Sequence, residues 1–348
     1  MNGTTDWESE RQTLLGRRIS ELGLTIRGSR VEKLVTELYL ELAARAIAFR
    51  PPVYLSDQWG CPDRTPLIGV PFYLVDARLE RIEAEMSGGV EDDAEALRYL
   101  RHECGHAINY AFRLYDRPDW RATFGSFALP YHERYRADPF SRAYVRHILG
   151  WYAQKHPDED FAETFAVWLT PGIDWRAEYA GWPALAKLEY VDRVLGEIAG
   201  ELPHVPAPSE DDLPVEAMHY TVAEHYESAA ERIPMEDPRQ FDADLRRIFA
   251  SPADAPSGMP AAVFMQRHYR EIVARLSYWT GESAAEVRSL IDAMIARAAQ
   301  LELRITGLEA STLIELTAFG AAVVMNYRYT RTLDRMPRAE RPMPQGTP

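Results

Sequence analysis

The amino-acid sequence predicts an α+β domain with a small β-sheet, followed by an all-helical domain. Three observations support this prediction. Strand-like runs occur in the first part of the chain, at 53–55 and 67–75. Apolar residues at helical spacing dominate the chain beyond residue 214. Between the two parts, residues 201–214 (ELPHVPAPSEDDLP) contain four prolines and a run of acids, which is typical of a linker.

The first domain is expected over residues 1–200. Apolar residues at helical spacing predict its first helix over 8–48, which the two prolines at 51 and 52 end. Further helices are expected over 91–115, 158–169 and 182–199. Pro71 places the run at 67–75 on the edge of the sheet, because proline lacks the N–H of the strand ladder.

The second domain is expected over residues 215–335. Its predicted helices cover 215–232, 239–250, 260–279, 284–303 and 312–332. Neither a metal-binding pattern nor a nucleophile pattern is found there, so the sequence gives this domain no role. The tail at 336–348 is rich in proline and is expected to be disordered.

Composition and charge exclude several classes of protein. The chain is 46% hydrophobic and 26% charged, as globular proteins are. Its net charge of −14 argues against nucleic acid or an anionic membrane as a partner. Two cysteines, Cys61 and Cys104, cannot build a disulfide scaffold, and the first ten residues lack the apolar core of a secretory signal. We therefore expect a cytoplasmic protein; the sequence does not indicate its oligomeric state.

The chemistry-bearing motif is His102-Glu103-Cys104-Gly105-His106, an H-E-x-x-H within the predicted helix at 91–115. Four residues of α-helix advance by about one turn, so both imidazoles project from one face and can bind one metal ion. Glu103 lies beside them, where it could take a proton from a bound water. Zinc suits such a mixed imidazole and carboxylate site.

A catalytic zinc needs a third protein ligand, and the fourth position is left for water. The predicted helix at 158–169 offers Glu159 and Glu163, which are four residues apart and share one face. Acids at a helix start also favour the helix dipole without any metal. That explanation does not account for Glu163, which lies one turn further into the helix.

These two motifs resemble those of the gluzincins, zinc metallopeptidases in which H-E-x-x-H is followed by a helix with E-x-x-x-E or E-x-x-x-D. The segments HECGHAINYAF and WYAQKHPDEDFAETFAVWL are similar to those of the bacterial family of putative zinc-binding metallopeptidases. The resemblance covers roughly residues 50–200 and implies a zincin-like peptidase domain in the first part of the chain. It says little about residues 201–348.

By this resemblance His102, His106 and Glu159 would be the zinc ligands. The 53 residues from His106 to Glu159 exceed the spacing in compact gluzincins, which leaves the third ligand open. Four other side chains remain competing candidates: Asp160, Glu163, His147 and His156.

The resemblance also implies roles for three other residues. Glu103 would be the general base, and Glu163 would hold a ligand histidine in the right tautomer. In related lethal-factor-type gluzincins a tyrosine seven residues before the ligand glutamate stabilises the oxyanion. Tyr152 lies seven residues before Glu159 and would have this role.

The sequence thus predicts a cytoplasmic zinc-dependent metallopeptidase that acts on a peptide or protein. The edge at 67–75 could align an extended substrate, or Pro71 could simply block aggregation there. One alternative is a zinc-dependent amidohydrolase that acts on a small or modified peptide. Another is a non-catalytic zinc-containing protein with a binding or regulatory role, although a purely structural site would not need Glu103.

Overall fold

The computed structural model describes residues 3–87, 89–132, 135, 137–148, 150–206, 213–228, 238–282 and 284–330. The chain divides into two compact units, Met1–Arg232 and Ile233–Pro348. Each unit has a hydrophobic core of its own.

This division differs from the predicted linker at 201–214. Val215, Met218 and Val222 are buried in the core of the first unit, so that unit continues beyond residue 214. Burial of these three apolar side chains stabilises the segment there. The predicted disordered tail at 336–348 lies outside the described residues.

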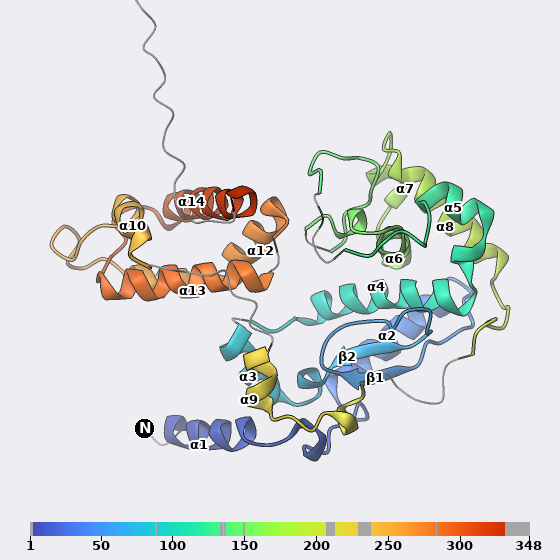
Figure 1. The fold of residues 1–348 in the computed structure, drawn as a ribbon, viewed down its shortest axis with the longest axis horizontal. Coiled ribbons are helices and arrows are strands. Elements are labelled where there is room, and N and C mark those ends of the chain that lie inside the picture. Colours follow the sequence, from blue (N-terminus) through green and yellow to red (C-terminus); the bar gives the residue numbers. More distant parts are fainter. Residues whose placement is uncertain are drawn as a thin grey trace, which may run out of the picture. The chain divides into compact units, whose positions relative to one another are not determined.

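The first unit contains the sheet and the helices that surround it (Figure 1). Its elements, in chain order, are α1 (Gly3–Leu15), α2 (Arg30–Ala44), β1 (Val53–Ser56), β2 (Ile68–Pro71), α3 (Ala77–Ser87), α4 (Asp93–Ala111), α5 (Pro118–Phe124), α6 (Pro157–Leu169), α7 (Trp175–Glu178), α8 (Ala184–Glu197) and α9 (Val222–Ser228). The helices predicted at 91–115, 158–169 and 182–199 are confirmed as α4, α6 and α8.

The predicted helix over 8–48 is instead two helices, α1 and α2. Between them, Gly23 and Gly28 have φ angles of 67° and 79°, a left-handed conformation that ends helical structure and favours glycine. The Ser29 side chain then accepts hydrogen bonds from the first backbone N–H groups of α2, which fixes where the second helix begins.

The sheet has two parallel strands, which pair from Val53 opposite Ile68 onward. The predicted strand at 67–75 is shorter than expected, because residues Phe72–Val75 form a 3₁₀ helix. On the outer edge of β2, Gly60 exchanges two backbone hydrogen bonds with Gly69, at 2.8 and 3.3 Å. The chain itself thus covers the edge at Gly69, which removes the place expected for an extended substrate.

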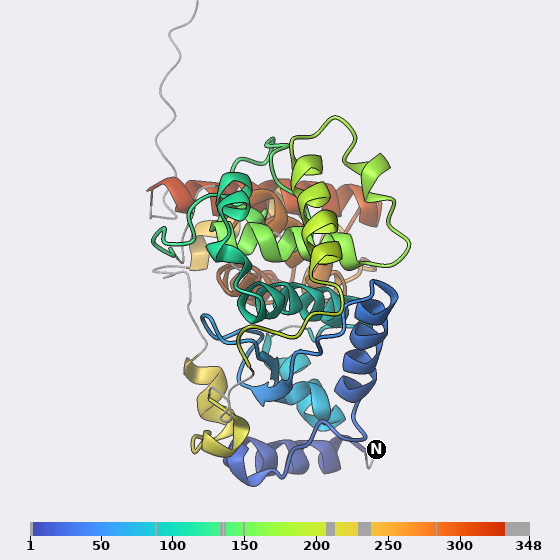
Figure 2. The same ribbon diagram turned by 90° about the vertical axis from the view of Figure 1, so that its right-hand side faces the viewer.

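Helix α4 is the central element of the first unit. Figures 1 and 2 show it between a layer formed by α2 and the sheet and a layer formed by α5, α6 and α8. It contacts α2 and β2 on one side and α6 on the other. All residues from Leu100 to Ala111 are buried, so this helix has no solvent face over the segment that bears the H-E-x-x-H motif.

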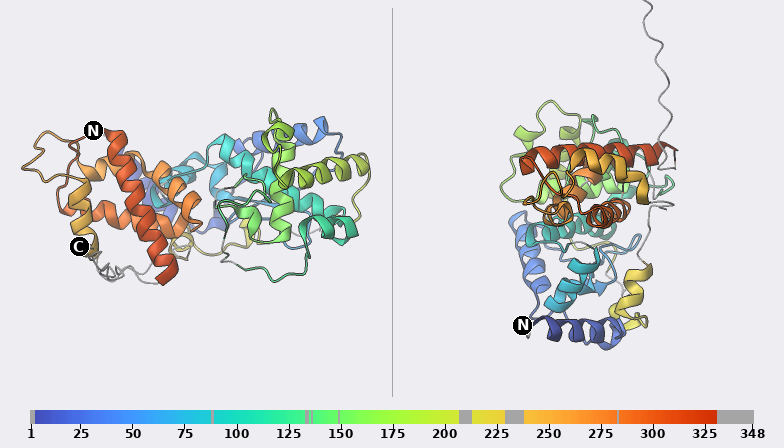
Figure 3. Two further views of the ribbon diagram at one scale, coloured as in Figure 1. Left: turned by 90° about the horizontal axis from the view of Figure 1, so that it is seen from above. Right: turned by 90° about the vertical axis from the view of Figure 1, so that its left-hand side faces the viewer.

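The second unit consists mainly of helices over its described residues, as predicted. Two predicted helices differ: the one at 260–279 is divided at His268, and of the one at 215–232 only Val222–Ser228 is α-helical among the described residues, where it belongs to the first unit. Its helices are α10 (Asp242–Ile248), α11 (Ala261–Arg267), α12 (Tyr269–Thr280), α13 (Ala284–Gln300) and α14 (Glu309–Thr330). Helix α14 packs on α12 and α10, and Figure 3 shows its length across this unit. Among the described residues, no helix has the length and apolar character that crossing a membrane requires.

Candidate metal centre

The contact between α4 and α6 is unusually close at Gly105. A Cβ atom at this position would lie 2.8 Å from the Cα of Ala162 and 3.0 Å from its carbonyl oxygen. Only glycine therefore lets the two helices approach to this distance without a shift of the backbone. Gly105 lies between the two histidines of the motif, so the same close approach brings both imidazoles against α6.

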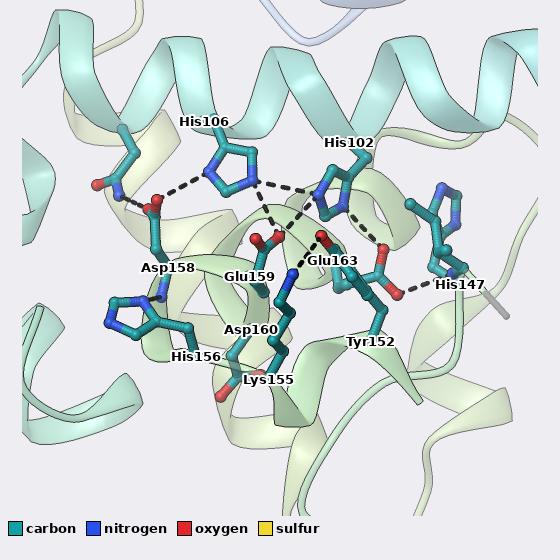
Figure 4. Close-up of polar contacts among 12 residues, drawn as sticks. His102, His106, His147, Tyr152, Lys155, His156, Asp158, Glu159, Asp160 and Glu163 are labelled. Atoms are coloured by element: carbon teal, nitrogen blue, oxygen red, sulfur yellow. Dashed lines mark hydrogen bonds and ion pairs between the residues drawn. The ribbon is translucent and has the colours of Figure 1, made fainter. Parts of the chain in front are cut away.

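Three side-chain atoms from these helices meet at one point (Figure 4). Glu159 Oε2 lies 3.0 Å from Nε2 of His102 and 3.1 Å from Nε2 of His106, and the two Nε2 atoms are 3.2 Å apart. All three residues are buried, with exposed fractions of 2–6%. These three residues form a group that can hold a metal ion.

The spacing of these atoms fits zinc. Zinc binds histidine nitrogen and carboxylate oxygen at about 2.0–2.2 Å, so tetrahedral ligands lie about 3.3 Å from one another. The observed separations of 3.0–3.2 Å come close to that value. The donor set of two imidazoles and one carboxylate is also one that zinc accepts in catalytic sites, with one position open.

Carboxylates behind the two histidines orient their rings. Glu163 Oε1 lies 2.8 Å from Nδ1 of His102, and the backbone N–H of Ile148 donates to the other oxygen of Glu163 at 2.8 Å. Nδ1 of His106 lies 3.0 Å from Oδ2 of Asp158, an ion-pair distance without hydrogen-bond alignment. Each Nδ1 thus faces an acid, which leaves each Nε2 lone pair to face the common point.

Asp158 is a site residue that sequence reasoning missed. The helix dipole alone explains an acid at this position, and nothing in the spacing distinguishes Asp158 from the other acids at the start of α6. In the structure the Asn109 amide donates to its Oδ1 at 2.8 Å, and the Tyr110 hydroxyl donates to its Oδ2. The carboxylate is therefore fixed in place beside His106.

The site has a strongly negative potential. Burial alone would lower the pKa of His102, but the Glu159 and Glu163 carboxylates outweigh it and raise that pKa to about 9. Burial likewise opposes protonation of His106, yet Asp158 and Glu159 raise its pKa well above the usual value. Carboxylates that hold protons on two buried imidazoles also attract a divalent cation to the same place.

The competing ligands have other partners. Asp160 accepts from the Lys187 ammonium at 2.6 Å, and Glu163 contacts the far side of His102. His147 Nε2 lies 3.0 Å from the carbonyl of Arg98, and burial lowers the pKa of this imidazole to about 4. His156 caps α6, because its Nδ1 accepts from the backbone N–H at 158 while Nε2 faces the Leu129 carbonyl at 3.0 Å. The structure therefore brings Glu159, and none of these four, to the common point.

Glu103 lies beside the three converging residues and lines the same cleft. Its exposed fraction is 8%, and burial raises the pKa of its carboxyl above the usual value. Among the described residues, none donates a hydrogen bond to this carboxylate or forms an ion pair with it. The carboxylate is thus available to a molecule in the cleft.

Tyr152 comes from the 3₁₀ helix Tyr152–Gln154, just before α6. Its ring centroid lies 5.5 Å from that of His102. Its hydroxyl lies 3.3 Å from the hydroxyl of Tyr131. It also lies 3.4 Å from the ammonium of Lys155 (Figure 4). Burial and the nearby Glu159 raise the pKa of the phenol, so it stays protonated and can donate a hydrogen bond.

The site opens into a cleft of about 790 Å³. One wall is formed by the segment 58–64, which follows β1, and the other by 127–131 together with the start of α6. None of the β2 residues belongs to the described lining of the cleft. Aromatic rings from Trp59, Phe127 and Tyr131 contribute to both walls, so the cleft combines an apolar surface with the polar centre.

Comparison with known proteins agrees with this geometry. Residues 77–174 match a protein family described as "putative zinc-binding metallo-peptidase", which confirms the predicted resemblance to that family. The matched segment contains both α4 and α6. The zinc-binding family and the buried His-His-Glu group together identify zinc as the cofactor of this site. No curated protein and no solved structure matches the chain.

Proposed function

We propose that this chain, which shares residues 77–174 with a family of zinc-binding metallo-peptidases, is a zinc-dependent peptidase that hydrolyses peptide bonds in the cleft above α4. One observation carries the proposal. The carboxylate of Glu103, which has no hydrogen-bond or ion-pair partner among the described residues, lies next to the His102, His106 and Glu159 group and lines the same cleft. A purely structural zinc site has four protein ligands and does not need such a base.

The chemistry is divided between the cofactor and the side chains. Zinc bound to the three ligands would lower the pKa of its water and polarise the substrate carbonyl. Glu103 accepts the proton of the attacking water on its carboxylate and passes it to the leaving amine. Burial of Glu103 supports this role, because its raised pKa brings the carboxyl closer to working pH.

Tyr152 is proposed as the oxyanion donor. Its protonated hydroxyl faces the cleft beside His102 and can donate to the carbonyl oxygen as negative charge develops there. The Lys155 ammonium, 3.4 Å from that hydroxyl oxygen, makes the O–H a stronger donor. Glu163 and Asp158 hold the two histidines so that Nε2 of each can bind the metal.

The cleft supports a peptide or protein segment as the substrate. Its volume of about 790 Å³ is at the upper end of small-molecule pockets, and its aromatic walls suit apolar side chains. The net charge of −14 supports the expectation that nucleic acids and anionic membranes are not partners. We also propose a cytoplasmic setting, which the two free cysteines and the composition support.

The decisive experiment compares the wild type with Glu103→Gln, with zinc content and hydrolysis of a mixed peptide library as the readouts. We expect Glu103→Gln to keep about one zinc per chain and to lose hydrolysis by about 10²-fold or more. Glu37→Gln, at an exposed position of α2, is the matched control and should keep both properties. A zinc-loaded wild type that cleaves no peptide, or a Glu103→Gln variant that cleaves like the wild type, would overturn the proposal.

A further inference from the structure

Tyr131 connects the rim of the cleft to the buried centre. This residue is 48% exposed, yet its hydroxyl donates to Oε1 of Glu159 at 2.5 Å. Glu159 is only 4% exposed. Within the part of the chain that the structure describes, the Tyr131 hydroxyl is the one donor to this oxygen. A buried carboxylate oxygen without a hydrogen-bond donor destabilises the folded state, so this hydrogen bond contributes to the stability of the site.

The two oxygens of Glu159 therefore have different partners. Oε2 lies 3.0 and 3.1 Å from the two histidine Nε2 atoms, whereas Oε1 is turned away toward Tyr131. When one oxygen of a carboxylate accepts a strong hydrogen bond, the carboxylate binds a cation through its other oxygen only. A carboxylate that is free to tilt can bind through both oxygens and take up an additional coordination position.

We propose that Tyr131 is a positioning residue, which holds Glu159 as a one-oxygen zinc ligand and so keeps a coordination position open for water or substrate. The inference rests on the proposed assignment of Glu159 as the third ligand. It adds a residue that the motif spacing does not indicate.

Several contacts hold the Tyr131 ring in this orientation. The Lys155 ammonium lies 4.4 Å from the ring centroid, within range of a cation–π interaction. The ring of His156, the residue that caps α6, lies 5.5 Å away. The Tyr152 hydroxyl lies 3.3 Å from that of Tyr131. The phenol is thus fixed from three sides and is aimed at Glu159, unlike a tyrosine that simply covers the surface.

The test uses Tyr131→Phe, which keeps the ring and removes only the hydroxyl. We expect its zinc affinity, measured by competition with a chelator, to fall about 10- to 100-fold. The visible spectrum of the cobalt-substituted protein is a second readout, because four-coordinate cobalt absorbs more strongly than five-coordinate cobalt. We expect weaker bands for Tyr131→Phe than for the wild type.

Tyr220→Phe is the matched control, because it removes the hydroxyl of a tyrosine that does not belong to the described lining of the cleft. Its metal affinity and cobalt spectrum should equal those of the wild type. If the wild type binds no zinc, or Glu159→Ala binds it as tightly, the ligand assignment itself fails. If Glu159→Ala loses zinc while Tyr131→Phe keeps wild-type affinity and spectrum, the assignment stands and the role of Tyr131 is refuted. Urea unfolding of both tyrosine variants with chelator present separates a folding defect from a change at the metal.

Discussion

Replacement of Gly105 by alanine tests whether the close approach of two helices builds the metal centre. The added Cβ would lie 2.8 Å from Ala162 Cα, 3.0 Å from the Ala162 carbonyl oxygen and 3.2 Å from Phe165 Cδ1. Comfortable contacts between carbon atoms are about 3.5–4.0 Å. Because two of the three atoms are backbone, side-chain rotation cannot relieve the overlap, and α4 and α6 must separate by about 0.7 Å or more.

The change in folding stability caused by Gly105→Ala is the sum of two opposing effects. Overpacking of a tight interior contact costs about 1–3 kcal/mol, while alanine in place of glycine favours the helix by about 1 kcal/mol. The net loss of stability is therefore modest, on the order of 0–2 kcal/mol. The effect on zinc should be larger, because His102 and His106 lie on one helix and Glu159 on the other. The oxygen-to-nitrogen distances of 3.0 and 3.1 Å would widen by a similar amount and no longer fit one tetrahedral ion.

Two measurements separate these effects. Urea unfolding with chelator present gives the stability of the metal-free chain, and chelator competition gives the zinc affinity. Gly196→Ala is the matched control, because Gly196 lies in α8 and a Cβ there meets no atom within 4 Å. We expect the control to be as stable as the wild type or up to about 1 kcal/mol more stable, with unchanged zinc affinity. If Gly105→Ala behaves like this control, the close helix contact does not set the ligand geometry.

Two further predictions concern the residues around the centre. Asp158→Asn should lower the zinc affinity, measured by chelator competition, about 10- to 100-fold, because His106 loses the charge that orients its ring. Asp116→Asn, at an exposed position, is the control and should bind zinc as the wild type does. His147 has a pKa of about 4 against 6.5 for an ordinary histidine, so the native state binds fewer protons than the unfolded state between these values and stability falls as the pH falls through them. We measure the free energy of unfolding in urea at about pH 7 and pH 4. The wild type should lose up to about 3 kcal/mol more of it on acidification than His147→Gln does. An equal loss in both proteins would contradict the lowered pKa of His147. The exposed His219→Gln is its control.

Long elements with clear spacing could be predicted from the sequence. In helices α4, α6 and α8, apolar residues recur at helical spacing and pack in the core, so the spacing predicts where along the sequence these helices lie. The break between α1 and α2 was missed, although Gly23 and Gly28 were present as signals. Apolar residues on both sides suggested one continuous helix, whereas the left-handed φ angles of the glycines decided the outcome.

The end of the first unit could not be predicted from local composition. A stretch with four prolines favours an extended linker, and that preference says nothing about where the chain goes afterwards. Val215, Met218 and Val222 belong to the first core because that core offers them buried positions. Such long-range burial depends on the assembled fold and leaves no periodic signal in a segment this short.

The side chains that converge in the site include the ones that the motifs indicated. The two histidines of α4 contact the two glutamates of α6, because helical spacing fixes which face each pair shares; these residues are His102, His106, Glu159 and Glu163. Asp158 and Tyr131 were not foreseen. Asp158 lies among acids with an ordinary helix-start explanation, and Tyr131 reaches Glu159 from a loop whose path only the folded chain defines.

The matching four-residue spacings on the two helices explain why the site could be found at all. His102 contacts Glu163 while His106 contacts Glu159, so the order reverses and the helices run in opposite directions across their contact. In such a pair, one turn along α4 corresponds to one turn back along α6, so histidines four residues apart meet glutamates four residues apart. Asp158, the residue before Glu159, also faces His106, but at Nδ1 rather than at Nε2. The four-residue spacing therefore indicates the two glutamates that face α4, whereas the Nδ1 partner of His106 is defined by the folded contact and not by that spacing.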